Sequence, residues 1–375
     1  MGYEIIREPF MLLETVWMLY RFVNKISFQQ DLSEHRYVTR TPIHEAAARR
    51  MLRLQEIADE VCAELDPEDP VLRRFFSNQE VDTEDRVDTC LAALMTFPLT
   101  AMGEPEFHKN AEEIRATWKR LQAEGAWIHP ESGNLLQFST EPEDHGDLFR
   151  QIRALNLPAE FRMELYDALR NFDQVFDELL ALIEPLARRL EKCYRRDAWL
   201  LAEPLEYWQA AFAELPPAEF LIHFLTLDED LSAMLREGDW VVGLSLMLGK
   251  NLVWHSKAGS PISPEKNYAY IGCAIDTSKQ RGRREERLEQ ISAILKILGD
   301  KKRLEVLQRL SRESSYCYEL AERMQVDYGN LSRTLATLHG YGFLRQKRGP
   351  SRTYYETDLD AIHEFLQVVE SIISK

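Results

Sequence analysis

The side chains best suited to chemistry lie in the last quarter of the chain, on a short stretch with helical periodicity. Leu331, Leu335 and Leu338 recur at helical spacing and predict one buried face. The opposite face carries hydrogen-bond donors and acceptors. These residues are Tyr328, Gly329, Asn330, Ser332, Arg333, Thr334 and Thr337. Side chains of these types can read base edges in the DNA major groove, and glycine allows close backbone approach.

A polar helix face can also be merely solvated, so the residues that follow it matter. Residues 343–347 and 352–357 are typical of two strands joined by Gly349-Pro350-Ser351. Four cations lie in this hairpin, namely Arg345, Lys347, Arg348 and Arg352. Cations there would neutralise phosphates rather than read sequence. The basic hairpin, or wing, therefore favours a DNA-binding face over a solvated one.

Three further helices are expected to position that face. An apolar stripe from Leu288 ends near Gly299, and Asp300 is placed to cap the next helix. A third helix over 315–324 is followed by the short connection Gln325-Val326-Asp327, whose aspartate can cap the polar helix. Two short helices joined by so tight a turn predict a helix-turn-helix unit.

This stretch resembles the winged helix-turn-helix domain of the ArsR family of bacterial regulators, over roughly residues 285–375. The matching motifs occur in the family's order: Leu298-Gly299-Asp300 with Arg303, Glu319-Leu320-Ala321, Leu331-Ser332-Arg333 with Leu335 and Leu338, Gly342 with Leu344, and Tyr354-Tyr355. The resemblance implies a cytoplasmic transcriptional regulator that binds a palindromic operator in double-stranded DNA. We expect it to act as a repressor.

The resemblance also implies a homodimer paired through the first and last helices of the domain. Both helices are more apolar than a small monomeric domain needs. The residues expected at the dimer interface are Leu288, Ile291, Leu295, Ile362, Leu366, Val369 and Ile373. The region before the domain could cover the same surface instead.

Metal sensing, which some family members perform, is not expected. Those members carry Cys-x-Cys before the Glu-Leu-Ala motif, where this chain has Tyr316-Cys317-Tyr318. One soft ligand between two phenols is not a thiolate site. Asp360 and His363 are the candidate ligands of the last helix, which lacks a paired second histidine. We therefore expect no metal and no cofactor, with Cys317 as a small buried residue.

Residues 1–278 read as a large, mostly helical region with a small β element. Apolar residues recur at helical spacing over 10–28, 43–65, 110–124 and 160–194. Pro185 should kink or interrupt the last of these helices. Within 238–275, two strands could turn near Gly249-Lys250-Asn251 and be joined by residues 268–275, although a buried helix also fits residues 240–254. The predicted fold class is mainly α, with a linker at 279–284 before the winged domain.

Charge divides the chain at the same place. The net charge is −16 overall, yet residues 281–375 carry +3 and residues 1–280 carry −19. An acidic body with a mildly basic tail is compatible with a tethered DNA reader. No run approaches ~18 apolar residues, so no membrane partner is expected. The five scattered cysteines indicate neither a disulfide framework nor a zinc cluster.

We expect a regulator, not an enzyme, that reads a non-metal signal, such as an unidentified small molecule, through residues 1–278. His44-Glu45 begins like a zinc-protease helix, but Ala48 stands where the second histidine is needed. No nucleophile elbow, phosphate loop or dinucleotide glycine pattern is present. Two alternatives stay open: an enzyme fused to a regulatory DNA-binding tail, and a winged helix used as a protein-interaction module.

Overall fold

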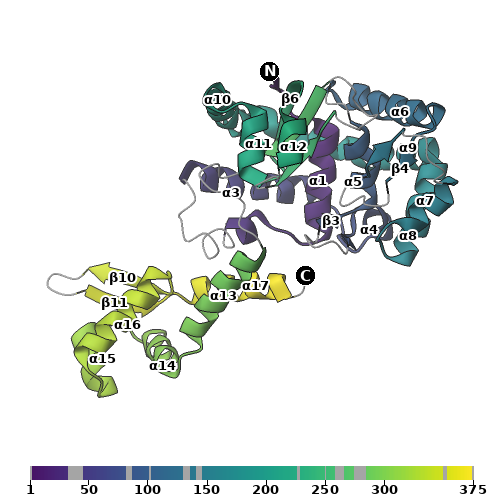
Figure 1. Cartoon of the computed structure of the whole chain (residues 1–375). Helices are drawn as coiled ribbons and strands as arrows, with labels where there is room; N and C mark the ends of the chain where they lie inside the picture. The colour runs from purple at the N-terminus through teal and green to yellow at the C-terminus, as the bar shows by residue number, and fades with distance from the viewer. Residues whose placement is uncertain are drawn as a thin grey trace. The chain divides into compact units, whose positions relative to one another are not determined.

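A computed structural model describes most of the chain and shows two compact units (Figure 1). The described residues are 2–32, 45–81, 87–100, 103–129, 136–140, 146–225, 229–249, 251–257, 266–273, 284–348 and 353–373. Unit 1 comprises Met1–Phe28 and Ala46–Arg281, and unit 2 comprises Gln29–Glu45 and Gly282–Lys375. The described part is mostly helical with small sheets, as the sequence predicts. The expected linker at 279–284 lies almost wholly outside the described residues.

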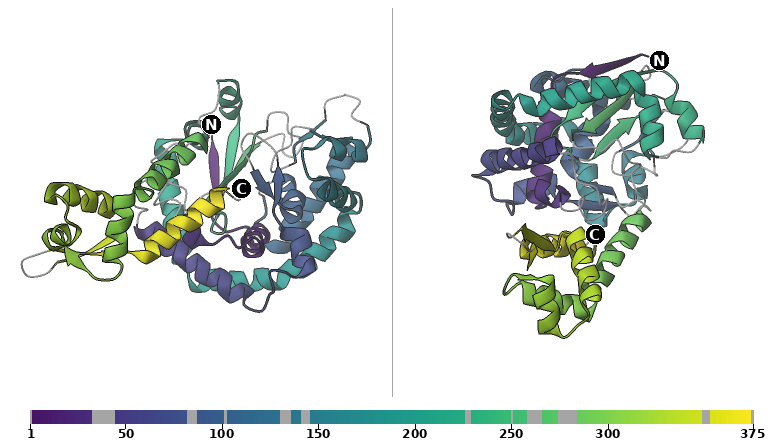
Figure 2. Two further views of the ribbon diagram at one scale, coloured as in Figure 1. Left: turned by 90° about the horizontal axis from the view of Figure 1, so that it is seen from below. Right: turned by 90° about the vertical axis from the view of Figure 1, so that its left-hand side faces the viewer.

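Unit 1 is organised around a four-stranded sheet of order β1-β6-β8-β7. Its strands are β1 (Tyr3–Ile6), β6 (Asp239–Ser245), β8 (Lys266–Gly272) and β7 (Leu252–His255). The first three are parallel, and β7 runs antiparallel to β8. Figure 2 shows β1, at the purple end of the chain, beside the green β6. The sheet therefore joins segments that lie more than two hundred residues apart.

The two faces of this sheet differ in chemistry. One face is apolar, and Trp240, Val242 and Leu244 pack there with Trp208 and Phe212. The helices over that face are α10 (Trp199–Glu214), α11 (Pro217–Leu225) and α12 (Glu229–Leu235) (Figure 1). Because side chains alternate along a strand, β6 and β8 turn Ser245 and Tyr270 to the opposite face, against α1 (Met11–Val23).

The strand pairing differs from the hairpin that the sequence suggests. Strands rather than a helix occupy residues 239–245 and 252–255, but β8 lies between them. The segment that follows β6 crosses the end of β8 closely. A Cβ on Gly272 would lie 2.1 Å from the Gly249 carbonyl oxygen, so the chain can pass there only above a glycine. Local alternation cannot reveal this insertion, because it depends on a distant strand.

The remaining helices of unit 1 pack against the sheet or against one another. They are α3 (Glu45–Cys62), α4 (Pro70–Phe76), α5 (Leu91–Thr96), the 3₁₀-helix η1 (Phe97–Leu99), α6 (Phe107–Ala123), α7 (Leu148–Ala154), α8 (Ala159–Arg170) and α9 (Phe172–Arg196). Two small hairpins pair β2 (Gln79–Val81) with β3 (Val87–Thr89), and β4 (Trp127–Ile128) with β5 (Phe138–Ser139).

The long helix expected over 160–194 is broken, but not at the proline. The break falls at Asn171, whose φ of −107° and ψ of 38° leave the helical region between α8 and α9. Pro185 lies inside α9, which continues through it to Arg196. An interior proline costs about 3 kcal/mol. Burial of Phe176, Leu179 and Ile183 on the same helix offsets that cost.

Unit 2 begins and ends with helices around a helix-turn-helix and a hairpin. Its elements are α13 (Arg284–Leu298), α14 (Lys301–Leu310), β9 (Ser315–Tyr316), α15 (Cys317–Met324), α16 (Tyr328–Gly340), β10 (Leu344–Arg348), β11 (Thr353–Thr357) and α17 (Leu359–Ile373). One cluster of buried side chains joins these helices, with Leu320, Leu335, Phe343 and Phe365 among its members. The predicted cap at Asp300 is confirmed, since its carboxylate accepts the Arg303 amide at 3.0 Å.

Candidate nucleic-acid interface

A tight turn between α15 and α16 sets the direction of the polar helix. Gln325 adopts the left-handed conformation (φ 55°, ψ 42°) and ends α15. The next amide, of Val326, donates back to the Ala321 carbonyl at 3.1 Å. Asp327 then caps α16 by accepting the Asn330 amide at 2.9 Å, as the sequence predicts. The turn therefore satisfies backbone groups at both helix ends and holds the start of α16 in place.

One face of α16 is apolar and buried, and the other is polar and exposed. Leu331, Leu335 and Leu338 are buried in the core of unit 2. The side chains of Asn330, Ser332 and Arg333 are exposed, and Tyr328 is 54% exposed. Gly329 and Thr334 are partly exposed. The structure thus brings the seven residues of the expected polar face, with Thr337 partly exposed, onto one helix, on and beside its solvent-facing side.

Arg333 is the cationic residue of the exposed face of α16. Its Nε donates to the Gly329 carbonyl one turn earlier at 3.4 Å, a long and weak contact. Within the described part of the chain, no carboxylate forms an ion pair with Arg333. Its guanidinium therefore keeps N–H groups that could donate hydrogen bonds to a guanine base or to a phosphate.

The hairpin after α16 has the two strands that the sequence predicts and one strand more. β10 and β11 are antiparallel, with Leu344 opposite Thr357 and Arg348 opposite Thr353. The two-residue strand β9 adds to β11 and was not anticipated, because residues 315–316 read as the start of a helix. At the base, the Thr357 hydroxyl donates to the Leu307 carbonyl of α14 at 2.7 Å.

Two cations of this wing form ion pairs within unit 2, which the sequence interpretation did not anticipate. Arg345 forms ion pairs with Asp358 at 2.7 Å and Asp360 at 3.0 Å, and Lys347 pairs with Glu356 at 2.6 Å. The hydrogen bonds that Arg345 donates to Asp358 first, and then to Asp360, raise the pKa of Arg345 above its ordinary value. The side chain of Arg348 and all of Arg352 lie outside the described residues. Sequence reasoning treated the four cations alike, since linear spacing does not reveal these pairs.

Of the two tyrosines that flank Cys317, Tyr316 packs against the hairpin. The Tyr316 ring meets Tyr354 edge to face, with centroids 5.7 Å apart. Cys317 is partly buried; burial raises the pKa of its thiol, and a hydrogen bond with Tyr328 opposes this rise. Among the described residues, no group of three or more His, Cys, Asp or Glu side chains is placed to hold a metal ion.

The residues expected at a dimer interface fall into two groups. Ile291 is buried in the core of unit 2, and Ile362 and Val369 pack against that core. Three others face outward, with Leu295 40%, Leu366 51% and Ile373 79% exposed. The side chain of Leu288 lies outside the described residues. Helical periodicity could not separate the groups, because both lie on apolar helices.

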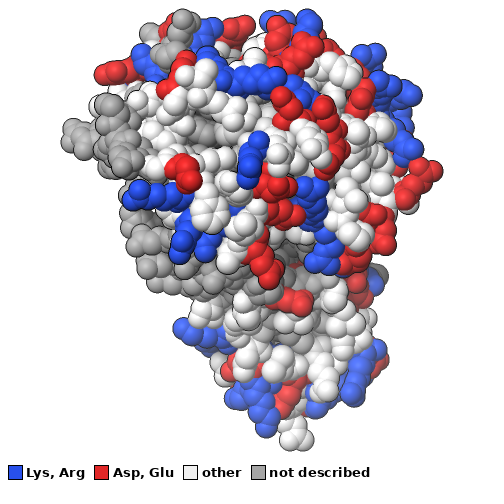
Figure 3. Space-filling view, turned by 90° about the vertical axis from the view of Figure 1, so that its right-hand side faces the viewer, with Lys and Arg blue, Asp and Glu red and all other residues white. Residues whose placement is uncertain are grey.

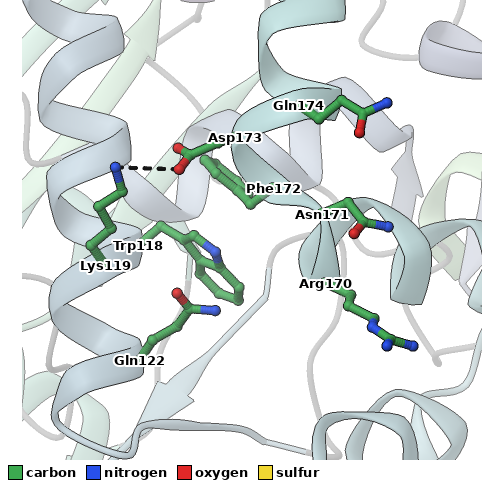
Figure 4. Close-up of a pocket in the computed structure, with 8 residues that line it drawn as sticks. All are labelled: Trp118, Lys119, Gln122, Arg170, Asn171, Phe172, Asp173 and Gln174. Carbon is green, nitrogen blue, oxygen red and sulfur yellow. Dashed lines mark ion pairs between the residues drawn. The ribbon is translucent and has the colours of Figure 1, made fainter.

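Unit 1 holds a shallow hollow of about 220 Å³ (Figure 4). Its residues come from α6 and from the junction of α8 with α9: Trp118, Lys119, Gln122, Arg170, Asn171, Phe172, Asp173 and Gln174. Figure 4 shows Lys119 directed at Asp173, and the two form an ion pair at 3.3 Å. The buried ring of Trp118 stacks on Phe172 with centroids 5.3 Å apart. The hollow brings together none of the residues that the sequence singled out.

A buried carboxylate in unit 1 was missed by sequence reasoning. Glu14 accepts hydrogen bonds from the Tyr270 hydroxyl at 2.7 Å, the Tyr194 hydroxyl at 2.8 Å and the Met247 amide at 2.9 Å. Burial raises the pKa of Glu14, and these donors, with Ser245, act in the opposite direction. The one available signal was an acid within the apolar run of α1. The contacts make Glu14 a link between α1, α9 and the sheet.

Charges of both signs are mixed on the face of the molecule that Figure 3 draws. In the face drawn in Figure 3, red and blue side chains alternate rather than form a single field. Many are paired, as in Arg53 with Asp197 at 2.8 Å and Arg196 with Glu60 at 2.9 Å. None of the described helices is long and apolar enough to cross a membrane.

Comparisons with known proteins give limited matches. No family model and no curated protein matches the chain. A transcriptional regulator, HlyU, from Vibrio vulnificus is 21% identical over 23% of this chain and 91% of its own, with a TM-score of 0.19. The homodimeric winged helix-turn-helix DNA-binding domain of a possible ArsR-family transcriptional regulator from Mycobacterium bovis is 25% identical over 25% of this chain and 89% of that one, with a TM-score of 0.21.

Proposed function

We propose that the chain is a sequence-specific DNA-binding transcriptional regulator. The observation that carries the proposal is the capped helix α16, which exposes Asn330 and an ion-pair-free Arg333 directly after a tight helix-turn-helix connection. In this proposal α16 is the recognition helix and the hairpin β10–β11 is the wing. Tyr328, Gly329, Ser332 and Thr334 lie on or beside the solvent-facing side of α16 and would complete the reading surface.

The regulator would act as a homodimer on a palindromic operator. Two recognition helices related by twofold symmetry enter successive major grooves, about 34 Å apart. The outward-facing leucines of α13 and α17 are the surface proposed for pairing. Unit 1 would read a non-metal signal, and the regulator would repress in the cytoplasm until that signal arrives.

Selection of bound sites from random DNA tests the proposal, followed by gel shifts over a salt series. Asn330→Ala should relax sequence preference, and Arg333→Ala should cost about 1–3 kcal/mol of specific binding. Arg348→Ala should weaken all sequences alike and reduce the salt slope by about 1. Arg195→Ala removes an exposed cation from α9 in unit 1 and is the matched control, with binding unchanged.

The result that contradicts the proposal is equally definite. If the unmodified chain enriches no site and shows no salt-dependent DNA binding, α16 is not a recognition helix. A winged unit used for protein interaction would then be the better explanation of the same exposed face.

A further inference from the structure

Arg345, at the base of the wing, is held by two carboxylates next to it. Its Nε donates to Asp358 Oδ2 at 2.7 Å, and its Nη2 donates to Asp358 Oδ1 at 2.8 Å. The same Nη2 reaches Asp360 Oδ2 at 3.0 Å. A bidentate pair of this kind fixes direction as well as distance, because the guanidinium is planar and its donors are rigidly spaced.

Asp358 is itself anchored by the backbone on both sides. Its amide donates to the Phe343 carbonyl at 3.0 Å, and its Oδ1 accepts the Ala361 amide at 3.1 Å, which caps α17. Its side chain is only 14% exposed. The position of Asp358 at the start of α17 is therefore fixed. Its ion pair with Arg345 holds the first wing strand, β10, against this point.

The second cation pair of the wing has a different geometry. Lys347 reaches Glu356 at 2.6 Å, and both residues belong to the hairpin, on β10 and β11. A contact within the hairpin joins its strands but does not restrain the hairpin against the rest of unit 2. Of the two described cation pairs in the wing, the Arg345 pair is thus the one that reaches α17.

We propose that Arg345 is a positioning residue that clamps the wing to the start of α17, and that it does not bind DNA phosphate. This proposal rests on the proposed function, since it assigns a role within the DNA-binding unit. In a dimer paired through α17, the clamp would also set where each wing stands relative to the dimer axis. Phosphate binding is then left to the wing tip and to the recognition helix.

Asp358→Asn separates the two roles of Arg345. Asparagine caps helices as well as aspartate does, so α17 keeps its start while the ion pair loses its charge. If Arg345 bound phosphate, this variant would release it, remove a nearby negative charge and tighten DNA binding. If Arg345 is a clamp, affinity should fall, by roughly tenfold, because a loosened wing must be ordered before it makes the same phosphate contacts.

The DNA experiment uses the full chain and the selected operator over a salt series. Arg345→Ala and Asp358→Asn should weaken binding to a similar extent, and the double variant should be no weaker than either single one. Each single variant should fall by the same factor at every salt concentration. The control is Glu305→Gln, which removes a carboxylate from an exposed pair on α14 and should leave affinity within about twofold.

Tighter binding by Asp358→Asn would overturn the clamp, as would a salt slope reduced by about 1 in Arg345→Ala. A readout without DNA keeps this result separate from failure of the proposed function. Amide exchange in β10 and β11 should be faster in Asp358→Asn than in Glu305→Gln. If the unmodified chain binds no DNA, the proposed function fails, and the exchange comparison alone decides whether Arg345 clamps the wing; equal exchange in both variants would refute it.

Discussion

At the scale of single residues, Glu14 shows how a charged side chain can belong in a core. Its carboxylate is enclosed, yet it accepts bonds from two phenols and from backbone amides at the end of β6. A buried carboxylate is tolerated only when such donors replace its lost water. The donors come from residues 180 to 256 positions away, so the carboxylate of Glu14 obtains its hydrogen-bond partners only in the folded unit.

Replacing Glu14 should reveal which donors matter. Glu14→Leu leaves the amides of Leu246 and Met247 buried without an acceptor, and should cost about 3 kcal/mol or more of unfolding free energy. Glu14→Gln should cost less, because its oxygen can serve the amides while the Tyr270 hydroxyl rotates to accept its NH₂ group. Urea unfolding followed by tryptophan fluorescence measures both.

The control for Glu14 is an acid of the same type at the surface. Glu191→Gln on α9 removes an exposed partner of Arg195 and should change stability by less than about 0.5 kcal/mol. Equal unfolding midpoints for Glu14→Leu and Glu191→Gln would show that the network does not hold unit 1 together.

At the scale of elements, the helix-turn-helix depends on its turn. Gln325 takes a left-handed conformation that costs energy for a residue with a side chain. The cap at Asp327 compensates by starting α16 at Tyr328, where the exposed reading face begins. The position of the first turn of α16 therefore follows from these two residues rather than from helix propensity.

Removing the cap should loosen the start of α16, the proposed recognition helix. Asp327→Ala should destabilise unit 2 by about 1 kcal/mol, because the Asn330 amide loses its acceptor. We expect faster amide exchange at Asn330 and weaker DNA binding. Asp327→Asn keeps an acceptor at the same place and is the control. Unchanged protection at Asn330 in the alanine variant would mean that packing alone holds the turn.

At the scale of the whole molecule, the outward-facing residues of α17 bear on assembly. Leu359, Leu366 and Ile373 are exposed, although Phe365 and Val368 of the same helix are buried in the core of unit 2. A second copy of the chain is the partner that a palindromic operator requires. Our proposal of a homodimer rests on this surface.

Leu366→Glu should weaken that dimer, because a charge would be buried at the centre of an apolar contact. We expect the dimer dissociation constant, measured by sedimentation equilibrium, to rise about tenfold or more. Leu304→Glu is the matched control, since Leu304 is similarly exposed but lies on α14. An unmodified chain that sediments as a monomer, or equal masses for both variants, would rule out this interface.

The sequence by itself determined the local features of unit 2. The caps at Asp300 and Asp327, the leucine face of α16 and the two wing strands follow from residues within a few positions of one another. Such features are set by helix and strand periodicity and by short-range hydrogen bonds, which a linear pattern records. The exposed polar residues of α16 could be predicted for the same reason, and their role in reading bases stays a prediction.

Only the tertiary structure decided the contacts between distant segments. The insertion of β8 between β6 and β7, the donors around Glu14 and the Arg345–Asp358 pair each join residues that a sequence window does not relate. The tertiary structure also shows that Ile291 is buried in the core whereas Leu366 faces outward. The physical reason is that burial and ion pairing depend on which elements meet in space, whereas periodicity reports only which residues share a face.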